Sequence, residues 1–422
     1  MKFIAVQTGA RRGYAVPAIL ERAGMLERFY TDVCGNVGLG RRLSRGKHLP
    51  LIGSRFARLG TREVPGNIVA KTYTFESAAV QASFFDLFGS KDPVRRFQRR
   101  VKIAAIWARA MIRQGFGSAT HVYSMLNEGG EFLTEAHRRG LKVVAEIYIL
   151  LATEQLMLSE RRAFPNWEPE APDYASLRRR FLKEDIIMMR THSYICPSEA
   201  VRDDLVRHWG VAIERTKVVP YGVNPRWLAL EPKPIRGRVL FVGTAGLRKG
   251  IHYLAMATEK LICRGRNYEF RVAGNVTDQV RRQPICRHLN FIGRVPRDRI
   301  HQEFQQADVF VLPSLAEGSA EVTYEAAAAG VPVVTTRAAG SIVRDDIEGR
   351  IVQERDLDAL ADAVEQIVEN RALRDQMAHA ARERARDYTW EQYGERLVTA
   401  LKHLANEGDA SFDSLASTVR NH

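Results

Sequence analysis

Residues 307–334 read ADVFVLPSLAEGSAEVTYEAAAAGVPVV, and this stretch decides the fold. The apolar run Val309–Leu312 predicts a buried strand, and the alanine-rich run Ala320–Ala329 predicts a helix that begins after a glycine-containing loop. Gly330 ends that helix, and Val331–Thr335 predicts the next strand. Strand, loop, helix and strand in this order are typical of a parallel α/β sheet.

The same alternation continues on both sides of this stretch. In the second half, strands are predicted at Arg238–Val242, Phe270–Ala273 and Leu289–Ile292, and helices at Lys249–Cys263, Ile300–Gln306, Leu357–Asn370 and 371–404. In the first half, strands are predicted at Lys2–Gln7, His121–Met125, Lys142–Leu150, Ser193–Cys196 and 217–222, and helices along Val16, Ile19, Leu20 and Leu26, at Glu131–Arg139 and within 153–190. The chain therefore falls in the α/β class.

Length and composition agree with two such units. A chain of 422 residues predicts two to three domains, and 45% hydrophobic with 27% charged residues is typical of a soluble globular protein. Pro225, Pro232 and Pro234 mark residues 225–238 as the linker between the halves. The segment from Ala405 onward is polar and is expected to fray.

Several classes of protein are excluded by simple counts. No apolar run reaches about 18 residues, which excludes a membrane-spanning helix. The opening Met1–Gln7 turns polar too soon for a signal peptide and predicts a first buried strand instead. The four cysteines form no CxxC pair, which argues against a disulfide scaffold or zinc knuckle and for a reducing compartment.

The positive charge is concentrated in one part of the chain. The formal net charge is +14, and residues 38–113 hold 16 Lys and Arg against 4 Asp and Glu. Within them, residues 94–109 predict an amphipathic helix with Phe97, Val101, Ala104 and Ala108 on one side, and residues 84–88 add an aromatic cluster. The region is interpreted either as a surface that lies on anionic lipid or as a helix that packs on its own domain. No nucleic-acid-binding signature accompanies it.

Two loops in the second half have the composition of a phosphate site. Residues 241–250 place Gly243 at a strand end and the pair Arg248-Lys249 at a helix start, where backbone N–H groups and two cations would neutralise a diphosphate. In the other loop, Glu317 follows the strand 309–312 and Glu325 lies about two helical turns further on. Two carboxylates at these places can hold hydroxyls of one elongated ligand. For Glu321, between them, complementing the helix dipole is the favoured role.

A third loop, the turn Gly293-Arg294-Val295, follows the predicted strand at Leu289–Ile292. Its backbone could contact a nucleobase, and an ordinary connecting turn is the alternative interpretation. Asp356-Leu357-Asp358 spells DxD, a metal–diphosphate motif of other enzymes, but it begins a predicted helix, so N-capping is favoured and no metal is expected.

At these residues the chain resembles the retaining nucleotide-sugar glycosyltransferases of the GT-B fold, family 4 (group 1). The resemblance covers most of the second half and rests on these elements: Gly243 with Lys249-Gly250, the Gly293 turn, residues 307–314, and Glu317-x7-Glu325 running into 326–333. The first half matches weakly, through 196–199 and 219–223. The resemblance implies two Rossmann-like domains that face each other across a cleft, an acceptor-binding domain at 1–222 and a nucleotide-sugar domain at 223–387. A last helix at about 388–404 would pack back on the first domain, followed by the polar tail 405–422.

The resemblance also implies roles for single residues. Glu317 with Arg248 and Lys249 would be catalytic: Glu317 would bind donor-sugar hydroxyls, and the two cations would hold the diphosphate as it leaves. Glu325 would bind the ribose. The remaining donor contacts would come from Gly243, Thr244, Gly293, Arg294, Val295, Gly318, Ser319 and Ala320. The acceptor side would comprise Gly9, Arg11, Arg12, Glu146 and Tyr148.

Two residues depart from the family pattern. Members often carry an arginine where Thr244 stands and a histidine where Tyr148 stands, with Glu146 nearby. The expected activity is transfer of a hexosyl unit from a UDP-sugar or GDP-sugar to a sugar or lipid-linked acceptor, with retention, in the synthesis of a surface polysaccharide or glycolipid. The expected place is the cytoplasm, peripheral on the inner face of the membrane through residues 38–113. The alternatives are a non-catalytic nucleotide-sugar scaffold and an epimerase or phosphorylase of the same fold.

Overall fold

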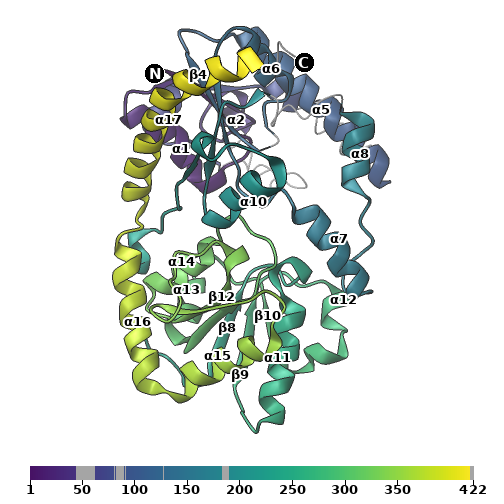
Figure 1. The fold of residues 1–422 in the computed structure, drawn as a ribbon, viewed down its shortest axis with the longest axis vertical. Coiled ribbons are helices and arrows are strands. Elements are labelled where there is room, and N and C mark those ends of the chain that lie inside the picture. Colours follow the sequence, from purple (N-terminus) through teal and green to yellow (C-terminus); the bar gives the residue numbers. More distant parts are fainter. Residues whose placement is uncertain are drawn as a thin grey trace.

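The computed structural model describes residues 1–43, 62–79, 81, 90, 92–126, 128–182 and 190–418. Their strands form two separate sheets, one in the upper and one in the lower lobe of Figure 1, and every strand pair is parallel. The first lobe holds β1 (Phe3–Val6), β2 (Leu26–Thr31), β3 (Thr72–Thr74), β4 (His121–Met125), β5 (Lys142–Glu146), β6 (Ser193–Cys196) and β7 (Thr216–Val218). The second lobe holds β8 (Arg238–Val242), β9 (Glu269–Ala273), β10 (Leu289–Gly293), β11 (Val309–Leu312), β12 (Val333–Thr336) and β13 (Gly349–Val352). The predicted α/β class with two Rossmann-like units is confirmed.

Strand order places the ligand-binding edge of each sheet. The first sheet runs β3-β2-β1-β4-β5-β6-β7 and the second β10-β9-β8-β11-β12-β13, so the order reverses between β1 and β4 and between β8 and β11. In open parallel sheets, ligands bind beyond the carboxyl ends of the strands at such a reversal. In the second lobe these ends lead directly into the loops 243–250 and 313–320.

The helices follow the strands in the expected alternation. The structure has α1 (Ala15–Arg22), α2 (Gly38–Leu43), α5 (Pro93–Gln114), α6 (Glu131–Arg138), α7 (Thr153–Ala163), α8 (Tyr174–Phe181), α10 (Glu199–Trp209), α11 (Ile251–Cys263), α12 (Asp278–Arg281), α13 (Ile300–Gln306), α14 (Glu321–Ala328), α15 (Leu357–Glu369), α16 (Arg371–Arg386) and α17 (Trp390–Thr418). All four side chains of β11 are fully buried, as expected for a central parallel strand covered on both faces. Asp356 caps α15 by accepting from the Ala359 N–H at 2.9 Å, so the DxD triplet begins a helix as predicted.

The last helix returns to the first lobe. In Figure 1, α16 runs along the second lobe and α17 continues upward beside α1. Leu397, Leu401 and Leu404 are buried at this contact. The expectation of a frayed tail from Ala405 is wrong as far as Thr418, because α17 extends to that residue. No proline stands between 405 and 418 to stop the helix.

The first half departs from the sequence prediction at its strands. Leu26 belongs to β2 and not to the preceding helix, which ends at Arg22. The expected strand 142–150 ends at Glu146. Strands β3 and β13 were not predicted, because Thr72–Thr74 and Gly349–Val352 lack the continuous apolar run of a buried strand.

The predicted basic helix exists as α5, capped by Asp92, which accepts from the Arg95 N–H at 2.8 Å. Its apolar side is covered by the protein itself. Ala108 is buried toward α6, and the Phe97 ring lies 6.2 Å from that of Phe181 on α8. The exposed face of α5 is therefore mainly basic. The aromatic cluster 84–88 lies outside the described residues. In the part of the chain that is described, no helix has the length and apolar character required to cross a bilayer.

Candidate active site

The turn after β8 places two cations side by side. A short 3-10 helix, η6 (Leu247–Lys249), follows Gly246 and ends at Gly250. Gly250 has φ +71°, and a Cβ there would lie 1.9 Å from the carbonyl oxygen of Pro313 in the loop after β11. Only glycine fits both conditions, so the two loops at the sheet reversal can approach closely.

Both cations meet one carboxylate from the neighbouring loop. Arg248 Nη1 lies 2.7 Å from Glu317 Oε2, and Lys249 Nζ lies 2.7 Å from Glu317 Oε1. Burial alone would raise the pKa of Glu317, but the nearby Lys249 and Arg248 outweigh it and lower that pKa. Arg248 also donates to the carbonyl of Ala316 at 2.9 Å. This cation–carboxylate cluster is thus ionised and anchored at the edge of the second sheet.

The loop from Glu317 leads into α14, whose N-cap Ala320 has no side chain that could cap the helix. The hydroxyl of Ser319 is engaged inside the lobe, 2.7 Å from both the Tyr324 hydroxyl and the Gly340 carbonyl. A ligand at this helix start would therefore meet Ser319 through its backbone and not through its hydroxyl.

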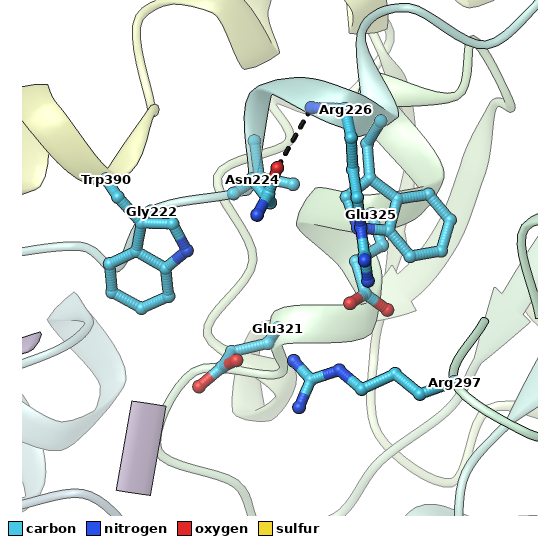
Figure 2. Close-up of a pocket in the computed structure, with 9 residues that line it drawn as sticks. Gly222, Asn224, Arg226, Arg297, Glu321, Glu325 and Trp390 are labelled. Atoms are coloured by element: carbon cyan, nitrogen blue, oxygen red, sulfur yellow. Dashed lines mark hydrogen bonds between the residues drawn. The ribbon is translucent and has the colours of Figure 1, made fainter. Parts of the chain in front are cut away.

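Further along α14, Glu325 and Glu321 line a cavity of about 220 Å³ (Figure 2). The opposite wall comes from the segment after β7 and from the start of α17, and comprises Gly222, Val223, Asn224, Arg226, Trp227 and Trp390. Arg297 completes the cavity, with its guanidinium directed toward the two carboxylates. Burial raises the pKa of Glu325 to about 7, against the opposing effect of Arg297. A group donating hydrogen bonds would favour the ionised carboxylate.

Only part of this cavity was predicted from the sequence. Glu325 was predicted to bind a ligand, whereas Glu321 was assigned to the helix dipole. Arg297, Asn224 and Trp390 were not singled out. Arg297 lies four residues after Gly293, and its position just beyond the end of a strand could have marked it as a candidate site residue. Asn224 and Trp390 have no such signal, because only the tertiary fold brings them together. Gly293, with φ +74°, ends β10, Arg294 is exposed and Val295 is half-buried.

On the first lobe, Glu146 at the end of β5 is fully buried. Its carboxylate accepts from the hydroxyls of Tyr123 at 2.6 Å and Tyr221 at 3.1 Å and pairs with Arg12. The Arg12 guanidinium lies 4.0 Å from the centre of the Tyr221 ring. The Glu146 carboxylate is therefore fully enclosed by its partners, while the Arg12 side chain keeps 7% of its surface exposed.

Arg11 and Tyr148 lie closer to solvent. The Arg11 guanidinium stacks 4.2 Å over the Tyr148 ring and its side chain is 41% exposed. The N–H of Gly9 donates to Asp32 Oδ1 at 2.9 Å. Glu128, which the sequence analysis did not single out, holds the same loop: it accepts from the Thr8 N–H at 2.7 Å. Burial raises the pKa of Glu128 to about 7.

The two lobes touch at the predicted site. Gly318 lies against the backbone of Tyr148 and Ile149, since a Cβ on Gly318 would come within 1.9 Å of the Tyr148 carbonyl oxygen. The hydroxyl of Ser198 donates to the Gly318 carbonyl at 2.6 Å. The structure thus brings Arg248, Glu317, Gly318, Tyr148 and Arg11 into one continuous set of contacts, while Glu325 lines its own cavity on α14.

Comparison with protein families identifies the second lobe. Residues 231–384 match the model described as Glycosyl transferases group 1. The chain is 29% identical over 234 residues to a glycogen synthase of Mycobacterium tuberculosis, which covers 53% of this chain and 56% of that protein. It is 31% identical over 219 residues to a phosphatidyl-myo-inositol mannosyltransferase of Mycolicibacterium smegmatis, covering 49% and 57%. The chain thus spans little more than half the length of these curated relatives.

Solved structures extend the fold likeness to the whole chain. A sucrose-phosphate synthase from Thermosynechococcus elongatus aligns with a TM-score of 0.65 at 16% identity, over 96% of this chain and 100% of that one. HepE from Anabaena, solved in complex with UDP and glucose, aligns with a TM-score of 0.58 at 14% identity, over 95% and 99%. The protein therefore has the two-lobed GT-B architecture, and residues 231–384 of its second lobe match the group 1 glycosyl transferase model.

Proposed function

We propose that this protein is a retaining glycosyltransferase that moves a hexosyl unit from a UDP-sugar or GDP-sugar to an acceptor hydroxyl. The observation that carries the proposal is the pairing of Arg248 and Lys249 with Glu317 beside the start of α14. Two cations, one carboxylate and a helix start fit a ligand with adjoining anionic and hydroxyl-bearing parts, as in a nucleoside diphosphate sugar. The UDP in HepE and the UDP and GlcNAc in pneumococcal GtfA support this donor class.

Each part of the donor has candidate partners. Arg248 and Lys249, with the backbone at Gly243 and Thr244, bind the diphosphate. Glu317 and the backbone of 318–320 bind sugar hydroxyls. Glu325 accepts from the ribose, and the turn 293–295 contacts the nucleobase. The donor then lies along the edge where the second sheet reverses its order.

The chemistry follows from where charge develops. The bond between the anomeric carbon and the diphosphate oxygen breaks, the acceptor oxygen bonds to that carbon from the same face, and the acceptor proton passes to the departing diphosphate. Negative charge grows on the diphosphate as the sugar becomes oxocarbenium-like. Arg248 and Lys249 are held in place before the reaction, so they stabilise that charge without reorganising. We propose that they do so without a bound metal.

The acceptor enters from the first lobe, where Arg11 and Tyr148 border the cleft. We propose a lipid-linked or polymer acceptor of the cell surface, consistent with relatives named for phosphatidyl-inositol mannosylation. The exposed basic side chains of α5 and α8 provide the contact with an anionic membrane, on its cytoplasmic face. These side chains are Arg95, Arg96, Arg100, Lys102, Arg109, Arg113, Arg179 and Arg180. Because Phe97 packs against α8, the contact is electrostatic and not insertion of an apolar face.

The donor is tested by thermal shift and by transfer of label from a panel of UDP-, GDP- and ADP-sugars to a native acceptor extract. We expect the sugars of one nucleotide to stabilise the protein. The variant Glu325→Gln is expected to bind that nucleotide about tenfold more weakly. Glu214→Gln, an exposed glutamate outside the site, serves as the matched control. Binding without transfer would favour a scaffold, an epimerised free sugar nucleotide would favour an epimerase, and absence of donor binding would refute the proposal.

The membrane contact is tested by sedimentation with vesicles. We expect recovery with anionic vesicles only, and its loss in R96Q/R100Q on α5. The variant R282Q/R299Q removes as many exposed charges from the second lobe and is expected to sediment normally. If the wild type stays in the supernatant to the same extent with anionic and with neutral vesicles, membrane association is refuted.

A further inference from the structure

A segment of the first half of the chain lies on the second lobe. After β5, helix α7 leaves the first lobe and packs beside η6 and α11, as the helix crossing at the right of Figure 1. Its Glu160 carboxylate is 3% exposed. It accepts from the Tyr253 hydroxyl at 2.7 Å, lies 2.8 Å from His252 Nε2, and pairs with Arg355 at 2.8 Å. All three partners belong to the second lobe.

Aromatic side chains extend this attachment beyond the end of α7. The ring centroid of Phe164 lies 4.5 Å from that of His252, and that of Trp167 lies 5.6 Å from it. His252 is fully buried and Trp167 is 6% exposed. The segment 153–168 is therefore fixed to the second lobe by the polar contacts of the buried Glu160 carboxylate and by ring packing, and is expected to move with that lobe.

The segment ends at the cation-bearing turn. Glu168 Oε1 accepts from the backbone N–H of Leu247 at 2.8 Å, and Glu168 Oε2 lies 3.0 Å from Arg161 Nε. Leu247 is the first residue of η6, and the N-cap Gly246 has no side chain to accept this bond. Gly246 also leaves room for the carboxylate, since a Cβ there would lie 2.9 Å from Glu168 Oε1. Glu168 thus caps η6 from a distant part of the chain.

We propose that Glu168 is a positioning residue for diphosphate binding. Its carboxylate fixes the start of η6, and the next two residues, Arg248 and Lys249, carry the cations that meet Glu317. A turn whose first N–H is released changes the direction of those two side chains. Arg161 holds Glu168 in the orientation that accepts from Leu247. This inference rests on the proposed function, because it assigns the turn to a diphosphate.

The test compares a nucleoside diphosphate with its monophosphate. Binding of UDP, UMP, GDP and GMP is measured by calorimetry on the full chain, and the preference for diphosphate over monophosphate is calculated for the base that binds. In Glu168→Ala this preference is expected to fall about tenfold, because a tenfold change in affinity corresponds to the free energy of about one charge-assisted hydrogen bond. Glu168→Gln keeps an acceptor oxygen and is expected to recover most of the preference. Glu170→Ala, an exposed glutamate on the same loop, is expected to match the wild type.

If Glu168 had a purely structural role, E168A would have a lower melting temperature and would bind the diphosphate and the monophosphate more weakly by the same factor. An unchanged preference in folded E168A and E168Q would therefore overturn the inference while leaving the proposed function intact. Failure of the wild type to bind any of the four nucleotides would overturn the proposed function together with the inference.

Discussion

Closure of the two lobes at Gly318 can be tested by adding a single methyl group. In Gly318→Ala, the new Cβ would lie 1.9 Å from the Tyr148 carbonyl oxygen and 2.9 Å from the Ile149 nitrogen. Both neighbours are backbone atoms, so they cannot rotate aside. The loop must retreat by about 1.5 Å to reach an ordinary contact of 3.4 Å. This retreat displaces the adjoining Glu317 from the first lobe.

A displacement of about 1 Å at a reacting centre costs about 100-fold in rate. We therefore expect kcat/KM of sugar transfer to fall about 100-fold in G318A. The melting temperature should change little, because the strand pairing within each of the two sheets is left intact. The assay is initial-rate transfer from the donor found in the nucleotide-sugar panel, with thermal unfolding measured in parallel.

Gly66→Ala is the matched control. Gly66 is exposed, has no atom within 4 Å of an added Cβ, and has no left-handed backbone angle. It should retain the activity of the wild type. If folded G318A keeps more than a third of the wild-type kcat/KM, the contact between Gly318 and Tyr148 plays no part in catalysis and the reasoning fails.

The remaining predictions concern ionisation and metal. Because burial raises the pKa of Glu325 to about 7, nucleotide affinity should rise from pH 6 to pH 8, and E325Q should flatten this dependence in calorimetric titrations. Glu128, with a pKa of about 7, keeps its proton in the folded state over a range where the unfolded chain has lost it. Its contribution to the free energy of unfolding should therefore fall by about 3 kcal/mol as pH rises from about 4.5 to 7. Denaturant unfolding of E128Q should show a shallower fall, and an equal slope would contradict the assignment. Transfer should persist in EDTA; activity restored only by Mg²⁺ or Mn²⁺ would show that Arg248 and Lys249 do not suffice.

The elements that could be predicted from the sequence are those whose signals are local. β11 and α13 have the predicted bounds because the apolar run Val309–Leu312 follows a polar helix and precedes Pro313. β2 was missed because Leu26 lies seven residues after Ile19, which is a helical spacing, although Gly24 stands between the helix and the strand.

The site divides in the same way. Glu317 with Arg248 and Lys249 was identified because each follows a strand end, and parallel strands bring such ends together. The wall formed by Asn224 and Trp390 was not, because 166 residues separate the two positions and only the return of the last helix joins them. Local sequence patterns do not show that two residues so far apart in the chain line the same cavity.

The attachment of α7 also bears on how far the halves of this molecule are interchangeable. A hybrid made by joining residues 1–222 of another protein to this second lobe would lose segment 153–168. His252 would lose the rings that cover it, Arg355 would lose its carboxylate partner, and the turn at Leu247 would begin without an acceptor. A functional graft of the second lobe must therefore include that helix and loop, so the unit of exchange is discontinuous along the chain.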